Sequence, residues 1–207
     1  MTNSSPGRIA MIFFFLLILS PALGRAQGKN EVKISGGSTT KVGTSFHDWY
    51  CVAEPVLRLA NNGIAAPIDG FINGIPDLSM NIAVMNLNCD NDNKTKVSKL
   101  EKNLQAALKS KDNPNIVFKM TKYVLKGDGT ATVNGNLTIA GVTKEVYFIV
   151  KLTEHINGTN LQAQGEVAVL MSDYGIEPVT ALFGMITTKD EVKIEFNVEL
   201  MQSQLTK

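Results

Sequence analysis

Strict alternation of apolar and polar residues near the C-terminus is the feature that most limits how this chain can fold. Between Glu191 and Leu200 the even-numbered positions are apolar, and charged or amide side chains occupy the odd-numbered positions. Successive side chains of a β-strand point to opposite faces of its sheet, whereas a helix places apolar residues three or four positions apart. The segment is therefore predicted to be a strand with one buried face.

The same period of two recurs upstream and predicts a run of antiparallel strands. It is clear in residues 116–120, 130–139, 144–152 and 161–171. Turn sequences separate these segments, at Gly127-Asp128-Gly129, Ala140-Gly141 and Asn157-Gly158. Asp-Gly and Asn-Gly pairs tolerate the positive φ of tight hairpins, so four consecutive strands are predicted to form a meander.

Three earlier segments, residues 32–35, 44–52 and 80–87, are also predicted to be strands, which gives about eight in total. Antiparallel strands with one-sided patterning form either a closed barrel or a two-sheet sandwich. The short hairpin connections favour an up-and-down barrel, because a Greek-key sandwich needs longer crossings. A barrel of about eight strands has an interior wide enough for one small ligand.

One short amphipathic helix is predicted between the early strands and the meander. Its apolar residues are spaced by three and four positions, at Val97, Leu100, Leu104 and Leu108. Asn113-Pro114 follows and ends the helical pattern.

The first 26 residues have the parts of a secretory signal peptide. Arg8 precedes an apolar run from Ile9 to Leu19, and Gly24 and Ala26 fit the small-residue cleavage rule. The run is short for a membrane span, which needs about 20 apolar residues, so no transmembrane segment is predicted in the mature chain. We expect residues 1–26 to be removed and residues 27–207 to form one periplasmic or secreted domain.

Cysteine count and charge narrow the chemistry further. Cys51 and Cys89 are the two cysteines, and an exported chain reaches an oxidising compartment, so a disulfide between them is predicted, with two buried free thiols as the alternative. The 20 basic and 19 acidic residues are too balanced to indicate electrostatic capture of nucleic acid or of an anionic membrane. Nucleic acid is therefore not expected as a partner.

The sequence lacks the recognisable motifs of catalysis and metal binding. It has no Gly-x-Ser-x-Gly elbow, no His-Glu-x-x-His pair and no phosphate-binding glycine loop. His47 and Asp48, next to the single tryptophan Trp49, motivate an enzyme most, but alternation sends Asp48 to the opposite face from its neighbours. His155 lies beside a predicted turn and is expected to be solvated. The protein is predicted not to be an enzyme and to need no metal or cofactor.

Several motifs together resemble the YceI-like family of secreted, lipocalin-like proteins that bind polyisoprenoid lipids. The residues Gly135-Asn-Leu-Thr-Ile-Ala-Gly-Val-Thr-Lys144 are similar to the family's most recognisable segment. Asn113-Pro114-Asn-Ile-Val-Phe118 before it, and Ser172-Asp-Tyr-Gly-Ile176 and the strand from Asp190 to Phe196 after it, are similar in order and spacing. The resemblance covers residues 80–200 well, whereas residues 54–75 depart from the family's early hairpin.

The resemblance implies an all-β, antiparallel, eight-stranded lipocalin-like barrel with a short packed helix. It also implies an apolar lumen that holds an isoprenoid or other long-chain lipid, for which no metal or catalytic group is needed. The predicted lining consists of inward-facing apolar residues of the meander and the last strand: Phe118, Met120, Val133, Leu137, Ile139, Phe148, Val150, Val167, Val169, Ile194, Phe196 and Val198.

The same alternation is expected of a barrel filled by its own side chains. The alternative function is therefore a cell-envelope interaction module with a solid, ligand-free barrel, whose loops at residues 54–76 and 173–189 contact another protein. Tyr174 and Phe183 in the second loop motivate this alternative. A homodimer is compatible with either function.

Overall fold

The computed structural model describes residues 30–43, 45–59, 78–91, 98–154, 160–178, 180–181, 183 and 185–201. The predicted signal peptide, His155 and the turn at Asn157-Gly158 lie outside these residues, as do residues 60–77 of the divergent early segment. Within the described residues, no helix is long and apolar enough to cross a bilayer.

The described part of the chain is built mainly from β-strands. The strands are β1 (Glu31–Thr40), β2 (Ser45–Ala53), β3 (Val56–Leu59), β4 (Leu78–Ala83), β5 (Asn88–Asn91), β6 (Asn115–Lys126), β7 (Thr130–Ile139), β8 (Val142–Glu154), β9 (Asn160–Leu170), β10 (Thr180–Ala181) and β11 (Ile186–Met201). The helix α1 spans Ser98–Ala107, and 3-10 turns occur at Val84–Asn86 (η2) and Ser172–Tyr174 (η3). The all-β prediction with one short helix is confirmed.

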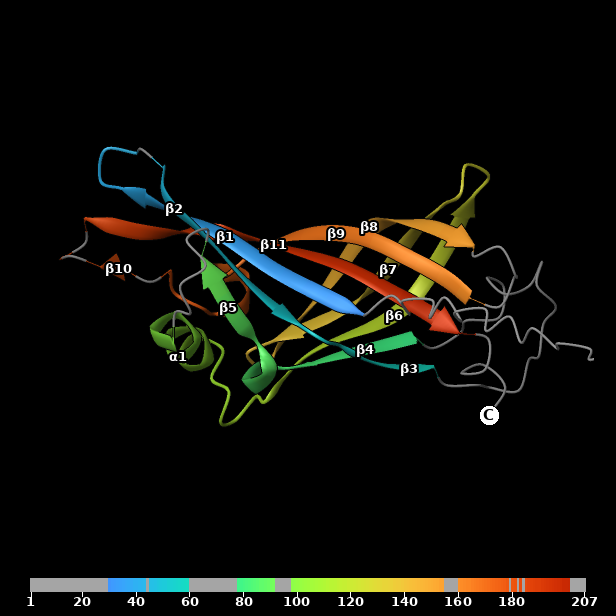
Figure 1. Cartoon of the computed structure of the whole chain (residues 1–207), viewed down its shortest axis with the longest axis horizontal. Coiled ribbons are helices and arrows are strands. Elements are labelled where there is room, and N and C mark those ends of the chain that lie inside the picture. Colours follow the sequence, from blue (N-terminus) through green and yellow to red (C-terminus); the bar gives the residue numbers. More distant parts are fainter. Residues whose placement is uncertain are drawn as a thin grey trace, which may run out of the picture.

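The strands form one curled antiparallel sheet (Figure 1). Its hydrogen-bonded order is β3-β4-β6-β7-β8-β9-β11-β1-β2-β5, and the short β10 pairs with β11. β6, β7, β8 and β9 pair in sequence as the predicted meander. β11 then crosses to lie between β9 and β1, which brings the C-terminal strand beside the first strand.

The main path holds ten strands, so the predicted count of eight is wrong. The reason is that two long strands are each interrupted. β3 continues β2 after Glu54 and Pro55, and proline has no N–H with which to extend a ladder. β5 continues β4 after η2, so residues 80–87 are not the single strand predicted for them. The chain therefore links the two ends of the path, β3 to β2 and β5 to β4.

Two tight turns fix the register of the meander. In the β6–β7 turn, the Asp128 carboxylate accepts hydrogen bonds from the Thr130 backbone N–H at 3.0 Å and from the Thr130 hydroxyl. In the β7–β8 turn, Ala140 and Gly141 both have positive φ, 49° and 83°. Two positive φ values are required by the two-residue hairpin turn that matches the twist of the flanking strands.

Helix α1 covers one end of the sheet (Figure 1). Leu100, Leu104 and Ala107 pack against the core, and Leu108 just beyond the helix is buried. The predicted spacing therefore identified the buried face of the helix, except that Val97 lies outside the described residues. The Cys89 backbone N–H donates a 3.2 Å hydrogen bond to the Glu101 carboxylate, which ties the helix to β5.

The predicted disulfide between Cys51 and Cys89 is confirmed. The two cysteines lie opposite each other in the β2–β5 ladder and are fully buried. The bond closes a loop of 38 residues between the early strands. It ties the short β5 to the body of the sheet where the ladder has four pairs.

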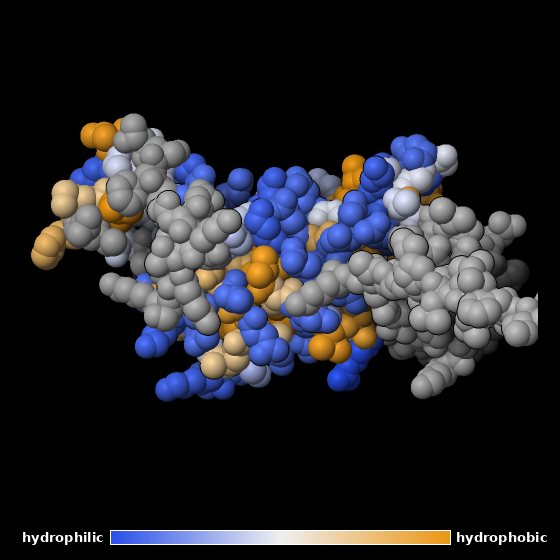
Figure 2. Space-filling model, in the orientation of Figure 1, coloured by the Kyte–Doolittle hydropathy of each residue, from blue (hydrophilic) through white to orange (hydrophobic). Residues whose placement is uncertain are grey.

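The outer surface of the barrel is mostly hydrophilic on the face shown in Figure 2, with hydrophobic side chains gathered near its centre. Inward-facing residues carry the core, as the period of two predicts. In β11, for example, Val192, Ile194, Phe196 and Val198 are buried while Glu191, Lys193 and Asn197 are exposed.

Candidate ligand-binding lumen

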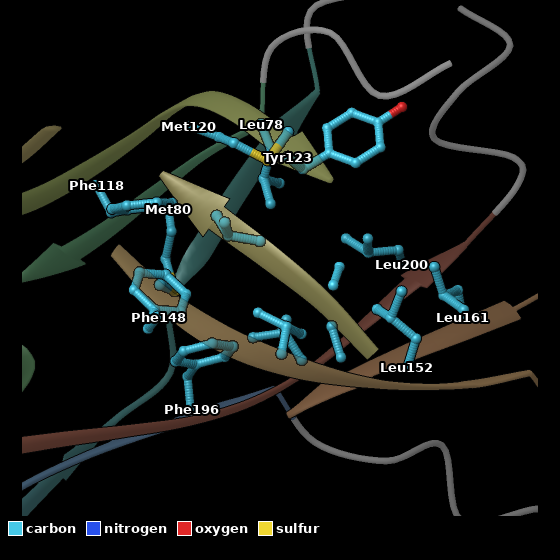
Figure 3. A pocket seen from close by; sticks show the side chains of 15 residues that line it. Leu78, Met80, Phe118, Met120, Tyr123, Phe148, Leu152, Leu161, Phe196 and Leu200 are labelled. Carbon is cyan, nitrogen blue, oxygen red and sulfur yellow. The ribbon is translucent and has the colours of Figure 1, made fainter. Parts of the chain in front are cut away.

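An apolar cavity of about 70 Å³ occupies the end of the barrel distant from α1 (Figure 3). We call it the distal cavity. Among the described residues, side chains from six strands, β4, β6, β7, β8, β9 and β11, surround it. Its lining residues are Leu78, Met80, Phe118, Met120, Tyr123, Ala131, Val133, Phe148, Val150, Leu152, Leu161, Ala163, Phe196, Val198 and Leu200.

The lining of the distal cavity carries no charged side chain, and Tyr123 supplies its one hydroxyl. The Tyr123 hydroxyl points away from the other labelled side chains in Figure 3. Partial burial raises the pKa of this phenol above its usual range, so it stays neutral at physiological pH. The cavity is therefore suited to hydrocarbon and unsuited to an ion.

Two smaller apolar cavities continue the interior toward α1. The middle cavity, about 20 Å³, shares Met80, Phe118, Phe148 and Phe196 with the distal cavity. The helix-end cavity, about 60 Å³, shares Ile34, Ile116 and Ile194 with the middle one. Trp49, Leu104 and Leu108 are among its other lining residues. The interior is thus an apolar series of three spaces separated by side chains.

The predicted lining residues are divided among these cavities. Seven of them line the distal cavity: Phe118, Met120, Val133, Phe148, Val150, Phe196 and Val198. Leu137 and Val167 line the middle cavity, and Ile194 lines both the middle and the helix-end cavities. Ile139 and Val169 line the helix-end cavity. All twelve residues therefore line the interior, and seven of them lie together around the distal cavity.

Three phenylalanine rings form the partition between the distal and middle cavities. The ring centroids of Phe118 and Phe148 are 5.4 Å apart, and those of Phe148 and Phe196 are 5.3 Å apart. Two glycines make room for the outer rings. A Cβ atom on Gly135 would lie 2.4 Å from the Phe118 ring, and one on Gly165 would lie 2.5 Å from the Phe196 ring. The rings are thus seated against bare backbone.

Eight lining residues of the distal cavity were outside the predicted set, and most carried the same signal. Ala131, Leu152 and Leu200 continue the alternation of predicted neighbours on β7, β8 and β11, and Leu161 and Ala163 do so on β9. Leu78 and Met80 come from β4. Tyr123 has the wrong parity for an inward residue, because a bulge shifts the register between Met120 and Lys122.

A surface cleft of about 350 Å³ lies between β8 and β9. The two strands pair from Val150 to Glu154 on β8, and the remainder of β8 has no pairing to β9. Tyr174 of η3 lines both this cleft and the helix-end cavity, so it is part of the wall between them. Burial and, less strongly, the Asp173 carboxylate raise the pKa of Tyr174.

Tyr174 is 2% exposed, and its hydroxyl is the buried side-chain polar atom that lacks a hydrogen-bond partner among the described residues. Tyr174 is therefore part of the packed interior and does not project from the loop toward a partner. Phe183, the other residue of that loop singled out by sequence, is fully exposed. Of the two residues that motivated a protein-contact loop, Tyr174 is thus buried and Phe183 is exposed to solvent.

The candidate catalytic segment at His47 and Asp48 lies in β2. Asp48 is exposed and Trp49 is buried, as alternation predicts, and the side chain of His47 lies outside the described residues. Within the described part of the chain, no three His, Cys, Asp or Glu side chains gather as a metal site would require.

The fold is similar to that of solved structures. The structure of BcnA from Burkholderia cenocepacia has a TM-score of 0.56 and 16% identity, and the match covers 82% of this chain and 96% of that one. A mutant of the Campylobacter jejuni YCEI protein has a TM-score of 0.51 and 17% identity, with 79% and 83% of the two chains covered. At such identities the likeness concerns the fold.

No curated protein is similar enough in sequence to count as a match. The model of the YceI-like domain, in contrast, matches residues 63–200. The match includes the whole β6–β9 meander and most of the terminal strand β11. This sequence match, together with the curled antiparallel sheet and its apolar interior, shows that the chain belongs to the YceI-like family.

Proposed function

We propose that the protein is a non-enzymatic binding protein that carries an isoprenoid or similar long-chain amphiphilic lipid in the lumen of the barrel. The observation that carries the proposal is the uncharged, apolar lining of the distal cavity, continued by two further apolar cavities. Each CH2 group moved from water into such a lining gains about 0.8 kcal/mol. Membership of the YceI-like family supports the same function.

A long chain needs more room than the three cavities offer in this structure. The distal cavity, about 70 Å³, is smaller than an engineered cavity of about 150 Å³ that admits benzene. Met80 and Met120 line it, and methionine side chains adapt their shape more easily than branched ones. We infer that ligand entry moves these side chains and the phenylalanine partition aside.

The proposed location is the periplasm or the exterior of the cell. The Cys51–Cys89 disulfide supports it, because disulfides persist in oxidising compartments. The predicted signal peptide at residues 1–26 is the second support.

Native mass spectrometry of protein purified from a lipid-containing host tests the proposal. We expect a lipid-sized adduct on the wild-type chain. Ala163→Leu places extra carbon atoms in the distal cavity and should reduce the adduct, because Ala163 is buried in its lining. Ala168→Leu is the matched control, since Ala168 lies on the same strand but is exposed, and it should retain the adduct.

The alternative, an envelope interaction module with a filled barrel, has two observations in its favour. The interior is divided by its own phenylalanine side chains, and Phe183 and Met185 are exposed on the loop before β11. A wild-type protein that carries no adduct, or an Ala163→Leu variant that carries as much lipid as the control, would favour this alternative.

A further inference from the structure

Charge is segregated between the two walls of the barrel, although the chain as a whole is nearly neutral. Strands β6, β7 and β8 together contain five lysines and two glutamates. Strands β9 and β11 contain two lysines and five acidic residues. Two of those acids are paired locally, Glu166 with Lys193 at 3.2 Å and Glu195 with Lys33 at 3.3 Å. The β6–β8 wall is therefore the basic side of the molecule.

Exposed hydrophobic side chains lie among the lysines of the basic wall. Val124 on β6 is 49% exposed, and Tyr147 and Ile149 on β8 are 77% and 57% exposed. These residues alternate with lumen-facing ones, since Phe148 and Val150 on the same strand are buried. Their outward direction is thus set by the strand period.

The strand register places these residues in adjacent rows. Lys122 lies opposite Asn134, which lies opposite Tyr147; Val124, Thr132 and Ile149 form the next row, and Lys126, Thr130 and Lys151 the third. We call the exposed members of these rows the basic wall patch: Lys122, Val124, Lys126, Tyr147, Ile149 and Lys151.

Three acidic residues border the basic wall patch. Glu166 on β9 is two residues from Gln164, which lies opposite Lys151, and Glu166 is paired with Lys193. Glu145 lies in the row beyond Tyr147, opposite Asn136. Asp128 lies in the β6–β7 turn, where Thr130 binds its carboxylate and Lys126 contributes to its lowered pKa. Within the three rows themselves every charged residue is a lysine, Lys122 in the first row and Lys126 and Lys151 in the third, and the second row is uncharged.

The patch and the distal cavity share one wall of the barrel. Tyr123, Val133, Phe148 and Val150 line the cavity, and their outward neighbours on β6 and β8 belong to the patch. We propose that the basic wall patch docks the barrel on an anionic bilayer surface, so that the lipid-binding end lies against the membrane. The biological role of this docking rests on the proposed lipid-binding function, whereas the arrangement of the patch residues does not depend on that function.

A bilayer fits the patch better than a protein partner does. Lysines attract anionic headgroups, and tyrosine and aliphatic side chains between them are suited to the headgroup level of a membrane. The competing occupant is a second copy of this chain, whose acidic β9–β11 wall would face the lysines.

Vesicle sedimentation with the purified protein tests the proposal. We expect binding to vesicles of phosphatidylcholine mixed with phosphatidylglycerol, weaker binding to phosphatidylcholine alone, and loss of binding as NaCl is raised. The variant Lys122→Gln/Lys126→Gln/Lys151→Gln should lower the partition coefficient on the order of a hundredfold. Tyr147→Ser/Ile149→Ser should lower it about tenfold, even at low salt.

The control removes the same charge from the other end of the barrel. Lys102, Lys109 and Lys111 are exposed in and just after α1. The variant Lys102→Gln/Lys109→Gln/Lys111→Gln should stay within about threefold of wild type, because the net charge is the same but the patch is intact. Circular dichroism checks that each variant is folded.

Three results would overturn the docking proposal. They are equal binding to the two kinds of vesicle, an equal loss in the control variant, or a concentration-dependent dimer that the patch variant abolishes without any vesicle binding. Native mass spectrometry of the patch variant separates the two proposals. An unchanged lipid adduct with lost vesicle binding supports both, whereas vesicle binding by a chain that never carries lipid leaves docking intact and removes the lipid-carrier function.

Discussion

At the scale of single residues, the lumen depends on two glycines that line none of the three interior cavities described above. Gly135 and Gly165 let the rings of Phe118 and Phe196 lie against the sheet backbone. A side chain at either position would compete with a ring for the same space. The glycines therefore set the positions of the two outer rings of the partition.

Gly165→Ala tests this dependence. Its Cβ would lie 2.5 Å from Phe196 Cζ and 2.9 Å from the Ile149 carbonyl oxygen. We expect a loss of about 1–3 kcal/mol in the free energy of unfolding, measured by urea denaturation, because overpacking forces side chains from their rotamers. Gly127→Ala is the control, since its Cβ would meet no atom within 4 Å. Equal losses in both variants would contradict the steric explanation.

The face on which a side chain lies could be predicted from sequence where the period of two is unbroken. Phe148 and Val150 on β8, and Phe196 and Val198 on β11, face the interior and line the distal cavity. The inward position of Tyr123 was not predicted, because a bulge beyond Met120 reverses which residues of β6 face the interior. No local sequence signal marks that bulge. The division of the interior into three cavities could not be predicted from sequence either. Alternation shows which face of the sheet a side chain occupies, but not which side chains it meets across the lumen.

At the scale of elements, η3 and the start of β11 are joined by a carboxylate. Asp190 accepts hydrogen bonds from the Ser172 backbone N–H at 2.8 Å and from the Ser172 hydroxyl. The Met171 N–H donates a 2.9 Å hydrogen bond to the Asp190 carbonyl oxygen. Both the side chain and the backbone of Asp190 therefore hold the segment that places Tyr174 in the wall. These hydrogen bonds to Ser172 lower the pKa of Asp190.

The lowered pKa predicts how the turn responds to acid. A carboxyl with a lower pKa in the folded state contributes stability at pH values above its unfolded pKa, and that contribution is lost as the pH falls through the folded pKa. The unfolded value is near 3.8. Asp190→Asn should therefore lower Tm at neutral pH, and the gap to wild type should shrink below about pH 4. Thermal melts at both pH values check this, and a gap that is constant with pH would contradict it.

Element boundaries were less predictable than element types for a physical reason. The helix and the meander follow from local periodicity, and both are present. The breaks between β2 and β3 and between β4 and β5 depend on how long strands bend around a curled sheet. Pro55 is visible in the sequence as one such break, whereas η2 interrupts a largely apolar segment, Met80 to Leu87, that contains no proline or glycine to mark the break.

At the scale of the whole molecule, the two ends of the lumen differ in what surrounds them. The distal cavity and the helix-end cavity have no lining residue in common, and the phenylalanine partition lies between the distal and middle spaces. Trp49, the single tryptophan of the chain, lines the helix-end cavity and is buried. Its emission therefore reports the occupancy of that end alone.

Because Trp49 lies at one end of the lumen, its emission can show how far along the barrel a bound isoprenoid chain extends. If an isoprenoid enters at the distal end, geraniol should bind without changing Trp49 emission, whereas the longer geranylgeraniol should cross the partition and shift the emission. The double variant Trp49→Phe/Tyr123→Trp moves the reporter to the distal cavity and should respond to both alcohols, because Tyr123 lines that cavity. A response of the Tyr123→Trp reporter to geranylgeraniol without any response of Trp49 would confine the ligand to the distal cavity and show that the phenylalanine partition stays closed.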